Sequence, residues 1–182
     1  ALLYETALQI QQTDFANTEE AEQSLAQLEI VLQLFDKHAH SEDTLVFSAI
    51  EQYEPSVADI FEKEHEKDHA LGERLKEFSA AFSNAGTEDG KIILGKKINQ
   101  AFIDFMVFNL EHMAKEEDII NTALWRYYTD AELQGITQKI VAAIPPSLMA
   151  LYSQWMMRGL SNNEITGWLK QVKNTAPDFV FQ

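Results

Sequence analysis

Apolar side chains recur along the chain at the three- and four-residue spacing of amphipathic helices. Four long segments follow this spacing, over residues 1 to about 12, 18 to 53, 55 to 83 and 91 to 128. No segment alternates apolar and polar residues in the manner of a half-buried strand. The sequence therefore predicts an all-α protein, with four helices joined by short loops into an antiparallel up-down bundle.

Beyond residue 128 the pattern changes to three shorter helices. Their starts are marked by Thr129, by the pair Pro145 and Pro146, and by a capping box that begins at Ser161. The middle helix is apolar on most faces, so we expect it to be sandwiched against the bundle or a second subunit. The sequence thus predicts a bundle domain at residues 1–128 and a helical extension at 129–182, with a homodimer through the extension as one option.

Composition removes several classes of function. The chain has 182 residues and no cysteine, which excludes disulfides, thiolate chemistry and sulfur-ligated metal sites. Its formal charge of −15 repels phosphate backbones, so we expect no nucleic-acid partner. No apolar stretch approaches the roughly 18 residues of a membrane span, and no basic segment opens the chain. We therefore expect a soluble, cytoplasmic protein without membrane contact.

Four of the five histidines belong to pairs of polar residues spaced four apart on the last three helices of the predicted bundle. A spacing of four brings two side chains to one helix face, about 6 Å apart along the axis, so both can reach one metal ion or two adjacent ions. The pairs are His38 and Glu42, His65 and His69, and His112 and Glu116.

Each pair continues the apolar stripe of its own helix, so we expect all six side chains to face the core. Burying them would cost several kcal/mol per unsatisfied group unless they are paired or coordinated to metal. A shared metal site removes that cost. The three stripes are Leu28, Val31, Phe35, His38, Glu42 and Leu45; Phe61, His65, His69, Gly72 and Leu75; and Ile98, Phe102, Phe105, His112, Glu116 and Ile119.

A purely structural origin of these pairs is the alternative. A single buried histidine is usually a hydrogen-bonded core residue, but three pairs on three consecutive helices favour a metal site. His40 lies on another face and is expected to touch the ligands from outside or to face solvent. The acidic run of Glu62, Glu64, Glu66 and Asp68 is interpreted as a solvated face without ligands.

Imidazole and carboxylate donors without sulfur suit non-haem iron, manganese or zinc. Carboxylates shared between helices suit two ions about 3.5–4 Å apart. The order of the three motifs, His-x-x-x-Glu, His-x-x-x-His and His-x-x-x-Glu-Glu, resembles the hemerythrin-like HHE family over about residues 1–128. This resemblance implies a pair of iron ions, with an oxo or hydroxo bridge as an option, in which His65, His69 and His112 hold one iron and His38 holds the other.

The resemblance also implies bridging roles for Glu42 and Glu116. Some family members place the last carboxylate one residue later, which here is Glu117, although the spacing of four favours Glu116. The family supplies a further histidine from the first helix, and this chain has none there. We expect that ligand upstream of the first residue, with Glu5 or Tyr4 as substitutes.

The function implied by the resemblance is binding or sensing of dioxygen, nitric oxide or iron itself. The ligand would then be a small neutral molecule, and zinc or manganese could replace iron. An enzyme of the oxidase, peroxidase or nitric-oxide-handling type would use the same metals but needs an access route and a proton donor. A third alternative is an interaction protein with a vestigial metal site.

Overall fold

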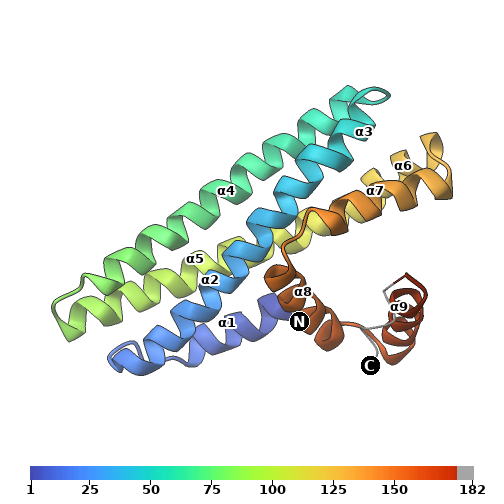
Figure 1. The fold of residues 1–182 in the computed structure, drawn as a ribbon. Helices are drawn as coiled ribbons and strands as arrows, with labels where there is room; N and C mark the ends of the chain where they lie inside the picture. Colours follow the sequence, from blue (N-terminus) through green and yellow to red (C-terminus); the bar gives the residue numbers. More distant parts are fainter. Residues whose placement is uncertain (176–182) are drawn as a thin grey trace.

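A computed structural model describes residues 1–175, and helices make up almost all of this part of the chain (Figure 1). No strand occurs within the described residues. The all-α prediction is confirmed. The four longest helices of the bundle are α1 (Leu2–Gln12), α2 (Thr18–Ser41), α4 (Pro55–Ser83) and α5 (Glu88–Lys115).

Two of these helices pass through a π-helical segment before they end. The chain continues from α2 into η1 (Glu42–Phe47) and α3 (Ser48–Glu51), and from α5 into η2 (Glu116–Ile120) and α6 (Asn121–Tyr127). The sequence predicted one uninterrupted helix in each place. A π turn holds one more residue than an α turn, so the core-facing position moves by one residue beyond it.

This shift corrects two predicted core positions. Leu45 and Ile119 were expected on the apolar stripes. Instead, Phe47 and Ile120 are buried, whereas Ile119 is exposed and Leu45 only half-buried. The apolar period before each π segment was correct, and the extra residue displaced the period after it.

Local chemistry explains where the bundle helices begin. The Asn17 side chain accepts the backbone N–H of Glu19 at 3.1 Å and caps α2. Pro55 is the first residue of α4, where its missing N–H costs nothing. At the start of α5, the Thr87 hydroxyl accepts the N–H of Gly90. These starts agree with the predicted ones, except that α5 begins three residues earlier than expected.

The bundle helices form a ring of neighbours. Helix α1 contacts α2 and α5, and α4 contacts the same two helices from the other side. Figure 1 shows that α2, α4 and α5 run alongside one another, whereas the short α1 lies against only one part of them. In the turn after α1, Phe15 packs on Gly95 so closely that a Cβ there would lie 2.2 Å from the Phe15 ring.

Two apolar clusters occupy the core. The larger one contains Leu28, Leu75 and Phe102, and the smaller one contains Phe47 and Phe61. Along α2, α4 and α5, the polar residues of the three motifs lie between the residues of these two clusters. Most of the predicted metal ligands therefore belong to a middle layer with apolar packing above and below it.

Three short helices follow the bundle, as predicted: α7 (Asp130–Ala142), α8 (Pro146–Gly159) and α9 (Asn162–Thr175). The capping box predicted at Ser161 is present, and the helix start predicted at Thr129 also carries a capping box. The predicted extension to residue 182 reaches beyond the described residues, and its division from the bundle as a separate domain stays a prediction.

Helix α8 touches the bundle on one side, and the predicted packing against a second subunit stays a prediction. The Tyr152 hydroxyl donates a hydrogen bond to the Leu34 carbonyl at 2.6 Å, and Arg158 pairs with Glu5. No residue of α8 is fully buried. The homodimer through the extension stays a prediction. Among the described helices, none combines the length and apolar character needed to cross a membrane.

Candidate metal centre

Four of the six predicted ligands meet in the middle layer of the bundle. The donor atoms of Glu42, His65, His112 and Glu116 all lie within 4.8 Å of one another. The Nε2 atom of His112 is 3.1 Å from Glu116 Oε1, and the Nε2 atom of His65 is 3.8 Å from the same oxygen. His65 Nε2 also lies 3.5 Å from Glu42 Oε2. Three helices thus direct nitrogen and oxygen donors at one small volume.

These inner atoms have no hydrogen-bond partners. Buried polar atoms of this kind cost about 1–3 kcal/mol each when they are left unsatisfied. Their convergence would satisfy a cation, since each one is a neutral nitrogen or a carboxylate oxygen when deprotonated. The residues present therefore fit a bound metal. The unpartnered buried atoms are His38 Nε2, Glu42 Oε2, His65 Nε2, His112 Nε2 and Glu116 Oε1.

The outer nitrogens of two histidines are held by carboxylates. Asp43 Oδ1 lies 2.6 Å from Nδ1 of His65, and Glu64 Oε2 lies 2.8 Å from Nδ1 of His112. Glu64 in turn accepts a hydrogen bond from Lys115 at 2.6 Å. A carboxylate that accepts the Nδ1 proton fixes the ring and leaves Nε2 free to coordinate, which is the usual arrangement around metal-bound histidine.

Charge balance in the metal-free centre is set by burial and by these pairs. Burial by itself lowers the pKa of His65. Contacts with the carboxylates of Glu116, Glu42 and Asp43 outweigh burial and raise this pKa to about 10. Burial likewise lowers the pKa of His112, and its carboxylate partners Glu116 and Glu64 more than reverse that effect.

Glu116 shows the opposite balance. Burial raises the pKa of its carboxyl, but contacts with His112 and His65 lower that pKa to about 2. Without metal, the imidazoles of His65 and His112 are therefore protonated and the carboxylate of Glu116 is ionised. A cation that binds there must displace those protons, so metal affinity should rise with pH.

Both bridging candidates occupy the same structural position. Glu42 is the first residue of η1, and Glu116 is the first residue of η2. In each helix the histidine lies one α turn earlier, so the regular turn before the π segment brings His and Glu to one face. π-helical turns inside α-helices are frequent at functional sites, and here both coincide with the predicted ligands.

His38 reaches the centre from its open side. Its Nε2 atom is buried and lies 3.3 Å from Glu42 Oε2, but 39% of its side chain is exposed. His38 is therefore brought to the edge of the cluster beside Glu42. Within the described residues, no carboxylate holds its other ring nitrogen.

His69 is not brought to the centre. Its side chain is 67% exposed, with Nδ1 4.0 Å from Asp36 Oδ1, and Asp68 is the buried residue on that turn. The expectation that His69 faces the core is wrong. Two successive steps of four residues, from Phe61 to His65 to His69, each rotate the position by about 40° away from the interior. Whether His69 nonetheless ligates metal stays a prediction.

The remaining alternatives are also placed by the structure. Glu116 is buried in the cluster, whereas its neighbour Glu117 is exposed on the surface. Tyr4 is exposed, and Glu5 pairs with Arg158, so neither substitute from the first helix points to the cluster. His40 is exposed, as expected for a residue on another face.

Two carboxylates of the centre were missed in the sequence. Glu64 was interpreted as part of a solvated acidic run, and Asp43 was not singled out. The contact between Glu64 and His112 joins residues 48 positions apart, on different helices. No local pattern in the acidic run could therefore predict it. Asp68, from the same run, is also buried and accepts a hydrogen bond from Asn109 at 2.6 Å.

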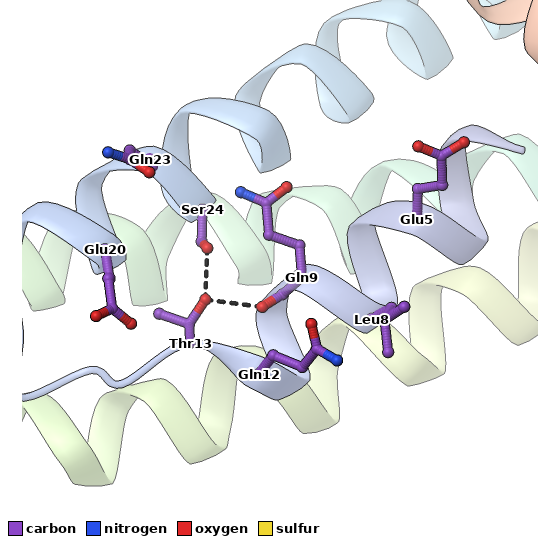
Figure 2. Close-up of a pocket in the computed structure, with 8 residues that line it drawn as sticks. All are labelled: Glu5, Leu8, Gln9, Gln12, Thr13, Glu20, Gln23 and Ser24. Carbon is purple, nitrogen blue, oxygen red and sulfur yellow. Dashed lines mark hydrogen bonds between the residues drawn. The ribbon is translucent and has the colours of Figure 1, made fainter.

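A separate pocket between α1 and α2 lacks this chemistry. Figure 2 shows polar side chains around it, with the Thr13 hydroxyl bonded to Ser24 and to the Gln9 carbonyl at 2.5 and 2.8 Å. The pocket measures about 360 Å³ and contains two carboxylates, of Glu5 and Glu20, without an imidazole. It offers no donor set comparable to the middle layer of the bundle.

Curated proteins with a similar sequence are known. The chain is 23% identical over 133 residues to F-box/LRR-repeat protein 5 of Bos taurus, and the same identity is found with that protein from Mus musculus. The matched segment covers 73% of this chain and 18% and 19% of the two relatives. The chain thus spans less than a fifth of the length of these curated relatives. No solved structure matches it significantly.

The family comparison covers most of the bundle. Residues 4–124 match the family described as Hemerythrin HHE cation binding domain. This range contains all six residues of the three motifs and both π segments. Two thirds of the chain lie in the match, and the chain belongs to the hemerythrin HHE cation-binding domain family.

Proposed function

We propose that the centre holds a pair of iron ions and that the protein binds or senses dioxygen, nitric oxide or iron. The donor set consists of the imidazoles of His38, His65 and His112 and the carboxylates of Glu42 and Glu116. Three nitrogens and four carboxylate oxygens suit non-haem iron, and carboxylates from two helices suit bridging between two ions. Such a set leaves coordination positions free on two six-coordinate ions.

The observation that supports this function best is the convergence of four unpartnered donors from three helices within 4.8 Å, with the buried Nε2 of His38 beside Glu42. With neutral imidazoles, each of these atoms would be left unsatisfied at a cost of about 1–3 kcal/mol, and a bound cation removes that cost. The carboxylates behind His65 and His112 strengthen the case, since they leave the inner nitrogens free to bind metal. Manganese or zinc would fit the same donors.

A neutral ligand has an apolar approach to the open side of the centre. A pocket of about 230 Å³ lies beside His38, between the bundle and α8. Its other walls include Phe35, Met113 and Trp155. Small neutral molecules can enter such a pocket without the repulsion that the acidic surface exerts on anions.

An enzyme that activates dioxygen or peroxide is the second candidate, and Tyr152 favours it. This tyrosine lines the same pocket and donates its hydroxyl proton to the Leu34 carbonyl. Burial raises the pKa of Tyr152 to about 12, with a further contribution from the charge of Glu42. The hydroxyl therefore keeps its proton at neutral pH, and it would donate that proton to a ligand in the pocket only by giving up the Leu34 carbonyl.

The experiment that tests the proposal measures iron per chain after anaerobic reconstitution, by mass spectrometry, together with the visible spectrum before and after exposure to dioxygen or nitric oxide. We expect close to two irons and a reversible spectral change. Sustained consumption of peroxide or nitric oxide with a reductant would favour the enzyme. Absence of metal would favour the vestigial site. As a control, His40→Ala should retain the full iron content, because His40 is exposed and lies outside the cluster on the helix that carries His38.

A further inference from the structure

A groove between α2 and α4 leads from the surface toward the metal centre. Its volume is about 450 Å³, and Ala39 is its only apolar lining residue within the described chain. Three imidazoles and five carboxylates line the rest. The carboxylates belong to Asp36, Asp43, Glu62, Glu66 and Asp68.

The inner end of this groove is a residue of the centre. His65 lines the groove although only 7% of it is exposed, and its Nε2 is one of the unpartnered buried atoms. Asp43 connects the two regions, because its carboxylate contacts His65 Nδ1 while 44% of its side chain remains exposed. The groove therefore reaches the Asp43 side of the His65 ring, and the unpartnered Nε2 of the same ring lies on the inner side, 3.5 Å from Glu42 Oε2.

The outer part of the groove offers donors that are too dispersed for a resident ion. His69 and His40 both line it and are exposed, and His69 lies 4.0 Å from Asp36. Among the described residues, the donors of the centre are the one group close enough together to enclose a cation. Exposed imidazoles and carboxylates at larger separations can hold a hydrated ion briefly and exchange it.

We propose that this groove is the route by which a divalent cation reaches the centre, with His69, Glu62 and Glu66 as transient ligands. The inference rests on the proposed function, which requires Fe²⁺ at the inner end. A negative cleft raises the local concentration of cations and their association rate, by about tenfold or more. The ion exchanges water for protein donors along the groove, and no electron transfer is involved.

The first test measures the rate at which metal-free protein takes up Fe²⁺ under anaerobic conditions, from competition with a chromophoric chelator. We expect the double variant Glu62→Gln/Glu66→Gln to load about three- to tenfold more slowly at low ionic strength, with unchanged final iron content. The control Glu22→Gln/Glu29→Gln makes the same change of charge on exposed positions of α2 that do not line the groove. It should load at the parent rate.

Equal slowing in both double variants would overturn the proposal, because general charge would then explain the rates. An unchanged rate in the groove variant would overturn it too. Added salt should abolish the difference between the variants, as expected for exposed charges. A difference that persists in high salt would contradict an electrostatic route.

His69→Gln gives a second, independent test. We expect slower loading with full final iron content, which identifies His69 as a transient donor. Loss of iron at equilibrium would make His69 a resident ligand and overturn its proposed role, as would an unchanged loading rate. If the parent protein binds no iron at all, the proposed function fails, and uptake of Zn²⁺ measured with the same chelator still tests the groove.

Discussion

The two His-x-x-x-Glu segments of the centre have the same sequence pattern and different surroundings. On α5, His112 is buried, its outer nitrogen is held by Glu64, and its ring stacks on Phe108 at an interplanar angle of 12°. On α2, 39% of the His38 side chain is exposed beside an apolar pocket. The segment with His112 is therefore enclosed by packing, and we call it the closed side. The segment with His38 borders a pocket, and we call it the open side.

This difference indicates a division of roles. Donors held by packing and by outer carboxylates need little reorganisation when a metal binds, so the His65 and His112 side should provide most of the affinity. The His38 side is less constrained and lies next to the pocket, so it should be the place where a ligand reaches the metal. The following predictions test this contrast, from the largest expected effect to the smallest.

Removing a donor from the closed side should have the largest effect. We expect His112→Ala to weaken metal binding by about 3–4 kcal/mol, a few hundred-fold, which is roughly one donor's share of the binding free energy of a structural metal site. The apolar clusters above and below should keep the chain helical. Isothermal titration with Fe²⁺ and circular dichroism measure the two quantities. Retention of full affinity by His112→Ala would show that the closed side does not bind the metal.

Acid should selectively destabilise the closed side in the metal-free protein. The pKa of Glu116 is about 2 in the folded chain and ordinarily 4.5, so its stabilising effect is complete above pH 4.5 and is lost as the pH falls toward 2. We expect a loss of at most about 3 kcal/mol in the free energy of unfolding.

Urea unfolding of the metal-free protein at several acidic pH values measures this loss. Glu116→Gln should flatten the pH dependence, whereas Glu117→Gln should retain it because that residue is exposed. At alkaline pH the loss of stability is due to His65. Because its pKa is raised from 6.5 to about 10, its contribution to the free energy of unfolding is complete below pH 6.5 and is lost as the pH rises to about 10. Equal curves for the two glutamine variants would contradict the assignment of Glu116.

Removal of an outer carboxylate should have an intermediate effect. Glu64→Gln leaves every proposed metal ligand in place but weakens the contact that orients His112, so we expect a 10- to 100-fold loss of metal affinity, about 1.4–2.8 kcal/mol. Glu77→Gln, on the same helix and not in contact with the centre's histidines, is the matched control. Equal metal affinities of the two variants would contradict a role of Glu64 in orienting His112.

The smallest effect on tight binding is expected at the open side. His38→Ala should lower the affinity of the first ion by less than about tenfold, since the donors of His65, His112 and Glu116 remain. It should remove the second ion and the spectral response to nitric oxide. Iron titration resolves the two steps. If His38→Ala abolished binding of both ions, the proposed division between closed and open sides would be wrong.

Much of the fold could be predicted because helix formation leaves periodic evidence in the chain. The start of α4 at Pro55, the end of α1 at Gln12 and the helix starts marked by Thr129 and Ser161 agree with the expected positions. The π segments could not be predicted, because one extra residue in a turn leaves no mark in composition. Their effect appeared only as buried Phe47 and Ile120 in place of the predicted Leu45 and Ile119.

The candidate site was predictable only as far as the helical period could be followed. For Glu42, His65, His112 and Glu116, the apolar stripe gave the correct face. For His69 it did not, because a residue at the edge of a stripe turns inward or outward according to how the helix packs on its neighbours. The carboxylates behind the histidines lay outside any motif.

The sequence by itself determined the helices, the absence of sulfur ligands and the spacing that presents a histidine and a glutamate on one face, because these depend on residues within a few positions of one another. The tertiary structure decided which donors meet, which of them are buried and which carboxylates hold them. Contacts such as Glu64 with His112 and Asp43 with His65 join different helices. Their formation depends on the rotation and depth of each helix in the bundle, which no local pattern specifies.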